Sequence, residues 1–266
     1  MAPTPRTVHL ARGMAVVEYL GLAAAAFVAG AINAVAGGGS LISFPALIAA
    51  GYSSKTANVT NTVALWPGYV GGSVGYREEL RGQSRRLWQL AVPNVAGALV
   101  GAVILLATPT SAFDRVVPLL ILFACAMIAL QDRIGRYTAA HRAAYADSGR
   151  MPPVVLVAMF VLGVYGAYFG AALGIMTLAV FVVLIDEGIQ RLNALKGMSS
   201  LIINAVAVVW FALFGPVRWL PAAVMAVGAL AGGYLGVGVA RRLGRDALRL
   251  AVIGYGVVVA VVLLIR

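Results

Sequence analysis

The sequence predicts an all-α integral membrane protein with about eight full transmembrane helices and two short half-helices, arranged as an inverted-topology repeat. Three observations lead to this fold class. Of the 266 residues, 62% are hydrophobic and 11% are charged, whereas a soluble domain carries about 25% charged residues. The apolar residues form long runs with almost no charge in them. Two shorter apolar runs each follow a glycine-rich break, at matching places in the two halves of the chain.

The full-length apolar runs have the length of a helix that crosses a bilayer, which needs about 17–25 residues, although a few run short. A helix is expected for each, because an isolated strand in lipid would leave its backbone groups unpaired. These runs lie near residues 16–36, 57–75, 89–107, 115–130, 154–172, 193–214, 222–239 and 250–265.

The two shorter runs cover residues 40–50 and 173–185. At a rise of about 1.5 Å per residue, each reaches only about half to two-thirds of the way through a hydrocarbon core of about 30 Å. The first run follows three consecutive glycines at 37–39, and the second follows the segment 170–174, which begins and ends with glycine. Both runs are therefore expected to be half-helices that start at a break inside the membrane.

The breaks also indicate an internal repeat. Aligning Gly30 with Gly163 brings Gly37 onto Gly170. We therefore expect one structural domain made of two membrane repeats, residues 1–135 and 152–266, which a cytoplasmic linker at 136–151 connects.

Arginine in the loops predicts how the repeats are oriented, because Lys and Arg gather on the cytoplasmic side. One loop of the first half is rich in Arg, and its counterpart at 215–221 has one. The next loop, 108–115, has one Arg, and its counterpart is rich. Equivalent loops should then face opposite sides, with both termini outside. The Arg residues of the rich loops are Arg77, Arg81, Arg85, Arg86, Arg241, Arg242, Arg245 and Arg249.

Composition argues against several functions. The net charge of +11 comes mostly from Arg in short loops, so no nucleic-acid partner is expected. Both histidines, His9 and His141, lie outside the predicted spans, so the G-x-S-x-G pattern at 71–75 lacks the His that a serine hydrolase needs. We interpret that pattern as a small-residue packing face, and we expect neither an enzyme nor a cofactor.

The first break is a candidate anion site. Ser40 is suited to cap the N-terminus of the half-helix, and the glycines Gly37, Gly38 and Gly39 allow a sharp reversal of the chain. A half-helix that starts there points unpaired N–H groups and the positive end of its dipole into the membrane interior, which favours anions. The alternative is a point of close helix packing. Gly170 opens the corresponding break of the second half.

Polar residues in or beside the spans are the remaining candidates, because amides and hydroxyls can donate hydrogen bonds to an anion. Lys196 is the one Lys or Arg within a predicted span, which is expensive unless the charge is paired or useful. The alternative is that its head group reaches the membrane interface. Thr60 and Asn61 start near the outer side and Lys196 near the inner side. These residues could therefore form one site or two separate gates, and the sequence does not decide between the two interpretations. The candidates are Asn33, Thr60, Asn61, Asn193 and Lys196.

Three segments resemble the sulfite/organosulfonate exporter family TauE/SafE, also called the toluene-sulfonate uptake permease family. Residues 29–45 read AGAINAVAGGGSLISFP, residues 57–64 read ANVTNTVA, and residues 193–196 read NALK. The second half departs from the pattern at 170–174, which reads GAALG without a triple glycine. The two half-sites are therefore not expected to be equivalent.

The resemblance implies transport of sulfite, a sulfonate or a related small organic anion across the bacterial inner membrane, with export favoured over import. The lack of an ATPase motif favours a secondary transporter, coupled to H⁺ or Na⁺ or driven by the substrate gradient itself. An anion channel and a transporter of a small carboxylate are the alternatives. The expected partners are the anion and the lipid bilayer. The sequence leaves the oligomeric state undecided, with a homo-oligomer as one alternative.

Overall fold

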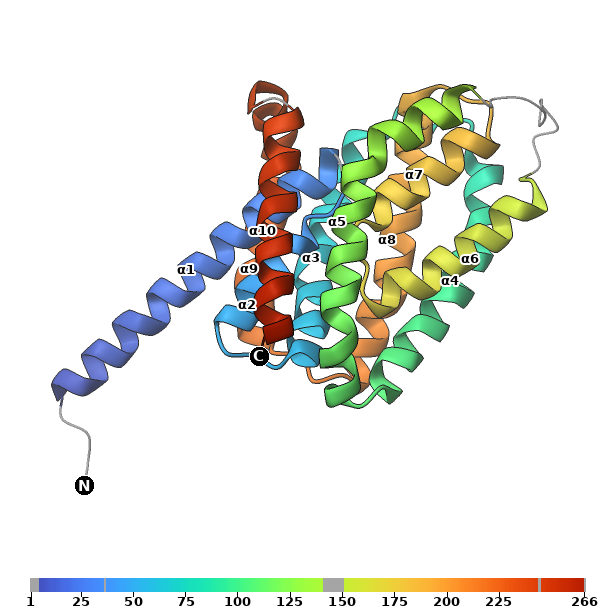
Figure 1. Cartoon of the computed structure of the whole chain (residues 1–266). Coiled ribbons are helices and arrows are strands. Elements are labelled where there is room, and N and C mark those ends of the chain that lie inside the picture. Colours follow the sequence, from blue (N-terminus) through green and yellow to red (C-terminus); the bar gives the residue numbers. More distant parts are fainter. Residues whose placement is uncertain (1–4, 36, 141–150, 244, 266) are drawn as a thin grey trace.

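The computed structural model describes residues 5–35, 37–140, 151–243 and 245–265, and the regular structure in these ranges is helical throughout (Figure 1). The helices are α1 (Pro5–Val35), α2 (Ser40–Ala49), α3 (Ser54–Gly75), α4 (Ser84–Ala107), α5 (Thr110–Ala140), α6 (Pro153–Tyr168), α7 (Leu173–Leu184), α8 (Ile189–Phe214), α9 (Trp219–Leu243) and α10 (Arg245–Ile265).

The short helices α2 and α7 confirm the two predicted half-length stretches. Within the described ranges, the segments long and apolar enough to cross a bilayer are Val16–Ala34, Ser84–Ala107, Thr110–Leu130 and Ile189–Phe214. The prediction of one helix over 154–172 is wrong at its end. α6 stops at Tyr168, because the chain leaves helical geometry at Phe169 and Gly170 takes a φ of +74°. α5 runs on to Ala140, and residues 141–150 of the expected linker, with His141, lie outside the described residues.

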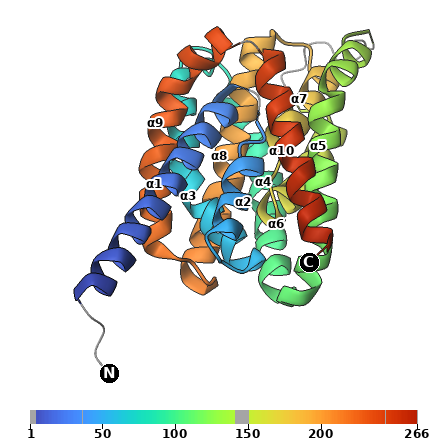
Figure 2. The ribbon, with the colours of Figure 1, turned by 60° about the vertical axis from the view of Figure 1, so that its left-hand side comes forward.

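Helices five apart in the order of elements make equivalent contacts. α1 packs along α9, and its counterpart α6 packs along α4; α3 packs on α9, and α8 on α4. Two counterpart pairs contact each other directly, α3 with α8 and α5 with α10. α5 and α10 lie side by side and run in opposite directions (Figures 1 and 2). The helices of the two halves of the chain are thus interleaved.

Glycines let the long helices of different halves approach at backbone distance. A Cβ on Gly97 or Gly101 of α4 would collide with carbonyl oxygens of α6, and one on Gly228 or Gly232 of α9 would collide with those of α1. This is the small-xxx-small packing of membrane helices, which is driven by close van der Waals contact since lipid supplies no hydrophobic force between helices.

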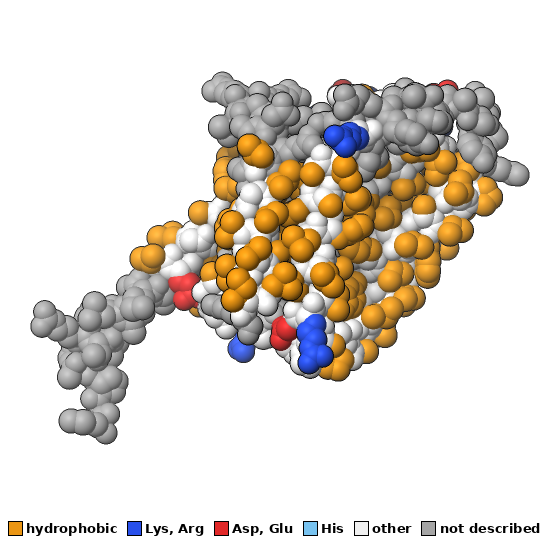
Figure 3. All heavy atoms as spheres, in the orientation of Figure 1, with side chains coloured by type: hydrophobic (Ala, Val, Ile, Leu, Met, Phe, Trp, Pro, Cys, Tyr) orange, Lys and Arg blue, Asp and Glu red, His pale blue; other side chains and the backbone are white. Residues whose placement is uncertain are grey.

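The outer surface is suited to lipid. Hydrophobic side chains cover the middle of the face seen in Figure 3, while charged side chains lie toward its upper and lower margins. Large hydrophobic residues are well exposed on several helices, among them Val92, Val157 and Val227. A contiguous apolar surface of this extent fits a bilayer and not water.

Candidate functional site

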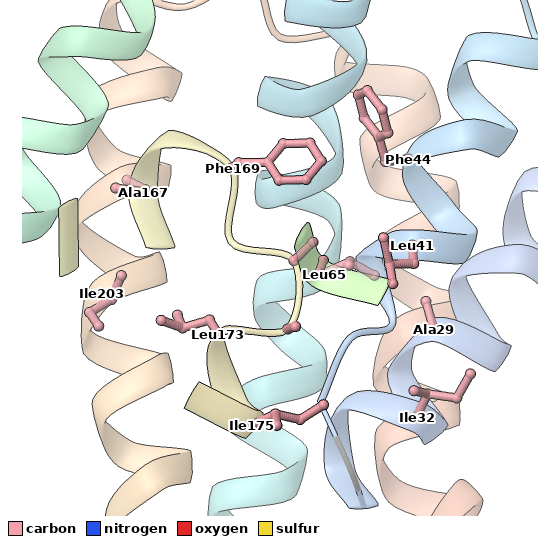
Figure 4. Packing of buried hydrophobic residues seen from close by; sticks show 14 of the residues in the cluster. Ala29, Ile32, Leu41, Phe44, Leu65, Ala167, Phe169, Leu173, Ile175 and Ile203 are labelled. Carbon is pink, nitrogen blue, oxygen red and sulfur yellow. The ribbon is translucent and has the colours of Figure 1, made fainter. Parts of the chain in front are cut away.

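The two breaks meet at the centre of the bundle. A Cβ placed on Gly37 would lie 3.2 Å from Gly174 Cα, so the backbones of the two halves of the chain touch there. In Figure 4 the α1–α2 and α6–α7 connections approach each other, and Phe44 of α2 faces Phe169 at the second break. Their rings make an edge contact with centroids 5.6 Å apart. α2 and α7 therefore both begin beside one junction, which we call the break junction (residues 37–40 and 169–174).

The backbone at the break junction uses left-handed geometry. Gly37 and Gly38 have φ of +82° and +99°, and Gly170 has +74°. Glycine adopts such angles without a steric cost, which explains the sequence here. Ala172 also has a positive φ, +59°, which is uncommon for a residue with a Cβ. The second break therefore achieves its turn with fewer glycines than the first.

The first break is held by Asn33 of α1. The backbone N–H of Gly39 donates a hydrogen bond of 2.8 Å to Asn33 Oδ1, which ties the end of α1 to the start of α2. The prediction that Ser40 caps α2 is wrong: Gly39 occupies the cap position, no side chain caps the helix, and Ser40 is its first residue. Because its side-chain oxygen accepts this hydrogen bond, Asn33 positions the turn between α1 and α2.

Two residues that the sequence reasoning did not assign hold the second break. Tyr165 Oη donates to the carbonyl oxygen of Ala171 at 2.7 Å, and Asn58 Nδ2 of α3 donates to that of Tyr168 at 2.9 Å. Both carbonyls follow or end α6, where the helix leaves acceptors unpaired. Asn58 could have been suspected from its place in the 57–64 segment. Tyr165 could have been suspected because its ring carries a hydroxyl and lies five residues before Gly170.

Lys196 lies beside the break junction. Its side chain is 5% exposed, so the interpretation as an interfacial lysine does not fit the structure. A Cβ on Gly174 would lie 3.7 Å from Lys196 Cδ, which places the lysine stem against the start of α7. Asn193, half-buried, is three residues earlier on α8 and so lies on the same helix face.

Thr60 and Asn61 are buried but are not brought to Lys196. Thr60 Oγ1 accepts a 3.1 Å hydrogen bond from the backbone N–H of Arg218, in the turn between α8 and α9. That bond makes Thr60 a fastening between α3 and this turn. Asn61 is 2% exposed, and its Oδ1 has no hydrogen-bond partner within the described part of the chain.

Three further buried hydroxyls lack partners among the described residues, Ser73 Oγ, Thr177 Oγ1 and Ser199 Oγ. Thr177 is three residues after Gly174 on α7, and Ser199 is three residues after Lys196 on α8, so each shares a helix face with the residue at the junction. An unpaired buried hydroxyl costs free energy unless a ligand or water pairs it. In the sequence, Thr177 is distinguished only as a single hydroxyl in an apolar run.

One end of the bundle carries an ion-pair cluster between the halves. Arg86 Nη1 lies 2.6 Å from Glu187 Oε2, and Arg191 Nε lies 3.1 Å from Glu187 Oε1. Partial burial would raise the pKa of Glu187, but the hydrogen bonds from Arg86 and Gly188 and the charges of Arg191 and Arg86 outweigh it and lower the pKa. Gln83 Nε2 adds a 3.3 Å bond to the Arg191 carbonyl. The 76–83 loop and the α7–α8 turn are thereby joined.

The opposite end has different fastenings. Lys55 Nζ, at the start of α3, donates to the carbonyl oxygens of Leu106 and Thr108 at 2.6 and 2.8 Å. These carbonyls end α4, where a positive charge also offsets the helix dipole. Among the described residues, no group of three His, Cys, Asp or Glu side chains is arranged to hold a metal ion.

Comparisons with known proteins agree on one family. A family model described as sulfite exporter TauE/SafE matches residues 22–263. A "probable membrane transporter protein" of Haemophilus influenzae is 28% identical over 84% of this chain and 85% of its own. "Probable membrane transporter protein ORF9" of Sinorhizobium sp is 26% identical over 80% and 79% of the two chains, and YfcA of Escherichia coli K12, also named a probable membrane transporter, 27% over 79% and 76%. No solved structure matches.

Proposed function

The chain belongs to the sulfite exporter TauE/SafE family, and from this membership we propose that it is a secondary transporter that exports a small anion across the inner membrane. The family match confirms the resemblance expected from residues 29–45. Sulfite, a sulfonate or a related small organic anion is the proposed substrate, with H⁺ or Na⁺ as the proposed coupling ion.

The observation that carries the proposal is the break junction with Lys196 beside it. Two helices start there, and the positive ends of their dipoles favour negative charge, while the N–H groups of Gly39, Leu41 and Leu173 already have acceptors within the chain. The aliphatic stem of Lys196 packs on Gly174, which is part of the break junction. Fixed donors and a positive charge in a low-dielectric interior favour an anion over a neutral molecule or a cation. The unpartnered hydroxyls of Thr177 and Ser199 add two nearby donors.

An inverted-topology repeat is part of the proposal. Three observations support it: counterpart helices make equivalent contacts, α5 and α10 run in opposite directions, and counterpart loops lie at opposite ends of α3. The 76–83 loop follows the end of α3, whereas the α8–α9 turn bonds to Thr60 near its start. The Arg-rich end, with Arg86 and Glu187, would be cytoplasmic, and both termini would lie outside.

Flux into proteoliposomes tests the function. The protein is reconstituted and screened with labelled sulfite, methanesulfonate, thiosulfate and small carboxylates. Saturable uptake of one or more anions is expected, and a steep temperature dependence separates a transporter from the anion channel. Transport of carboxylates alone would favour the small-carboxylate alternative, and absence of flux for every anion would contradict the proposal.

Substitutions of Lys196 connect the flux to the junction. Lys196→Met keeps the apolar stem and removes the charge, so we expect a raised KM or lost flux, with Lys196→Arg intermediate because its charge has another shape. Lys55→Met is the matched control, since it removes a lysine that bonds to helix-end carbonyls. It should lower thermal stability and leave KM unchanged. Parental kinetics in both Lys196 variants would remove the lysine from the site.

A further inference from the structure

The helices α3 and α8 are counterparts that cross each other. Their first residues, Ser54 and Ile189, are 135 positions apart, and the same separation aligns Asn58 with Asn193 and Trp66 with Leu201. Trp66 Nε1 donates to the carbonyl oxygen of Leu201 at 3.3 Å, so this counterpart pair is in direct contact. Two equivalent residues can contact each other only near the approximate two-fold axis that relates the two repeats.

The contacts on either side show that α3 and α8 are antiparallel. Toward the end of α3, Ser73 Oγ lies 3.9 Å from a Cβ placed on Gly197, near the start of α8. Toward the start of α3, Val59 Cγ1 lies 3.1 Å from a Cβ placed on Gly215, just past the end of α8. The Trp66–Leu201 contact therefore marks the middle of the crossing.

This register puts Asn61 and Lys196 in equivalent positions on opposite sides of the crossing. Asn61 lies five residues before Trp66, and Lys196 lies five residues before Leu201. At a rise of about 1.5 Å per residue, their levels differ by about 15 Å along the helix axes. Lys196 is in the second turn of α8, on the Arg86–Glu187 side of the crossing, and Asn61 is in the second turn of α3, on the Lys55–Thr108 side.

The two positions have the same geometry and different chemistry. Both side chains are almost fully buried, with exposures of 2% for Asn61 and 5% for Lys196. Asn61 carries no charge, and its atom without a partner in the described ranges is Oδ1, an acceptor, so only its Nδ2 amide can donate to an anion. Lys196 is the one Lys, Arg, Asp or Glu among the described residues that is buried to this degree. The two positions are therefore equivalent in the backbone and different in charge.

We propose that this difference, Asn61 in one repeat and Lys196 at the equivalent position of the other, makes the affinity for the anion higher on one side of the membrane than on the other. This inference rests on the proposed function. The half of the path near the Arg86–Glu187 end holds the anion by the charge of Lys196. The half near the Lys55–Thr108 end offers a neutral amide station at Asn61. An anion that arrives from the lysine side binds more tightly than one that arrives from the asparagine side.

Side-resolved kinetics test this inference. Protein is reconstituted in one orientation, and the KM for methanesulfonate, a monoanion, is measured from each face; if the flux screen identifies another anion, that anion is used. We expect the KM at the Arg86–Glu187 face to be at least about tenfold lower, which corresponds to about 1.4 kcal/mol. Lys196→Asn should raise the KM at this face and make the two faces alike.

The exchanged variant gives the sharper result. Asn61→Lys combined with Lys196→Asn should reverse the difference, with the lower KM at the Lys55–Thr108 face. If this variant does not fold, the Lys196→Asn result alone decides. Equal KM values at both faces of the parent, or an equal change at both faces in Lys196→Asn, overturn the asymmetry. Saturable parental flux in that case leaves the proposed function standing, whereas absence of flux for all anions removes both.

Discussion

Gly37 and Gly174 bring the two halves of the chain into backbone contact: a Cβ on Gly37 would lie 3.2 Å from Gly174 Cα, and a Cβ on Gly174 would lie 3.5 Å from Gly37 Cα. Gly37 lies three residues before the start of α2, and Gly174 is the second residue of α7. The contact brings the starts of α2 and α7 into one small region, which is the site proposed for the anion.

Gly37→Ala should therefore damage transport through the junction itself. Two costs add at this position, the positive φ of +82° and the close approach to Gly174. Gly51→Ala is the matched control, because Gly51 has a φ of +90° with nothing within 4 Å of its Cβ. We expect both variants to lose about 1–2 kcal/mol of stability from the backbone angle.

Only Gly37→Ala should also lose flux, measured in proteoliposomes at equal amounts of folded protein. Similar flux in the two variants would mean that the junction is a packing contact. Gly38→Val should likewise abolish flux while protein remains in the membrane, since its φ of +99° excludes a branched side chain.

Counterpart loops should label from opposite sides of the membrane. Single cysteines at Glu78, Ser111 and Pro216, all exposed, are introduced with Cys125→Ser, which removes the buried native thiol. A membrane-impermeant maleimide added outside intact cells should modify positions 111 and 216 and spare position 78 until the membrane is opened. Modification of 78 and 216 from the same side would contradict the inverted repeat.

Thr60 should act on stability and not on substrate affinity. Thr60→Val removes the acceptor of the Arg218 N–H and should cost about 1–2 kcal/mol in thermal unfolding in detergent. Thr60→Ser keeps the hydroxyl and should restore most of that loss. The KM should stay at the parental value in both variants; a KM that rises in Thr60→Val and recovers in Thr60→Ser would place this hydroxyl on the substrate path.

Acidification should weaken the Glu187 cluster. The pKa of Glu187 is lowered in the folded protein, so its ion pairs contribute stability that is complete above the ordinary pKa of a glutamate and is lost as the pH falls through the lowered value. The loss should be about 1 kcal/mol, given that Arg86 and Glu187 are partly exposed. Glu187→Gln should lack this part of the pH dependence as the pH falls from about 6 to about 3, a range that includes the ordinary glutamate pKa and the lowered value. Identical pH profiles would rule the pair out as a stabilising contact.

Helix positions were largely readable from the sequence, because hydrophobic runs in lipid have a length set by the bilayer. The starts of α2 and α7 were predicted at residues 40 and 173, as found. The end of α6 was misplaced by four residues. Apolar residues continue through Phe169, Ala171 and Ala172, so composition did not reveal a backbone that leaves the helix there.

The candidate site was readable in part. Glycine at 37 and 170 signalled the breaks, and a lone lysine signalled position 196, because both residue types are costly in such places without a reason. Asn33 and Thr60 were proposed as ligands, yet each accepts a backbone hydrogen bond that fixes the fold. Sequence shows that an amide or hydroxyl is present; only the three-dimensional arrangement shows which backbone group it pairs with.

The interleaving of the halves constrains how the protein is made. α1 packs most extensively on α9, which ends at Leu243, so α1 is synthesised long before its main partner exists. α4, by contrast, meets α6 after the short interval of α5. Contacts between such distant segments form slowly. Truncation after α5 should therefore leave α1 with its glycine contacts unmade and the product open to membrane quality-control proteolysis, whereas the two halves, co-expressed, can complete each other.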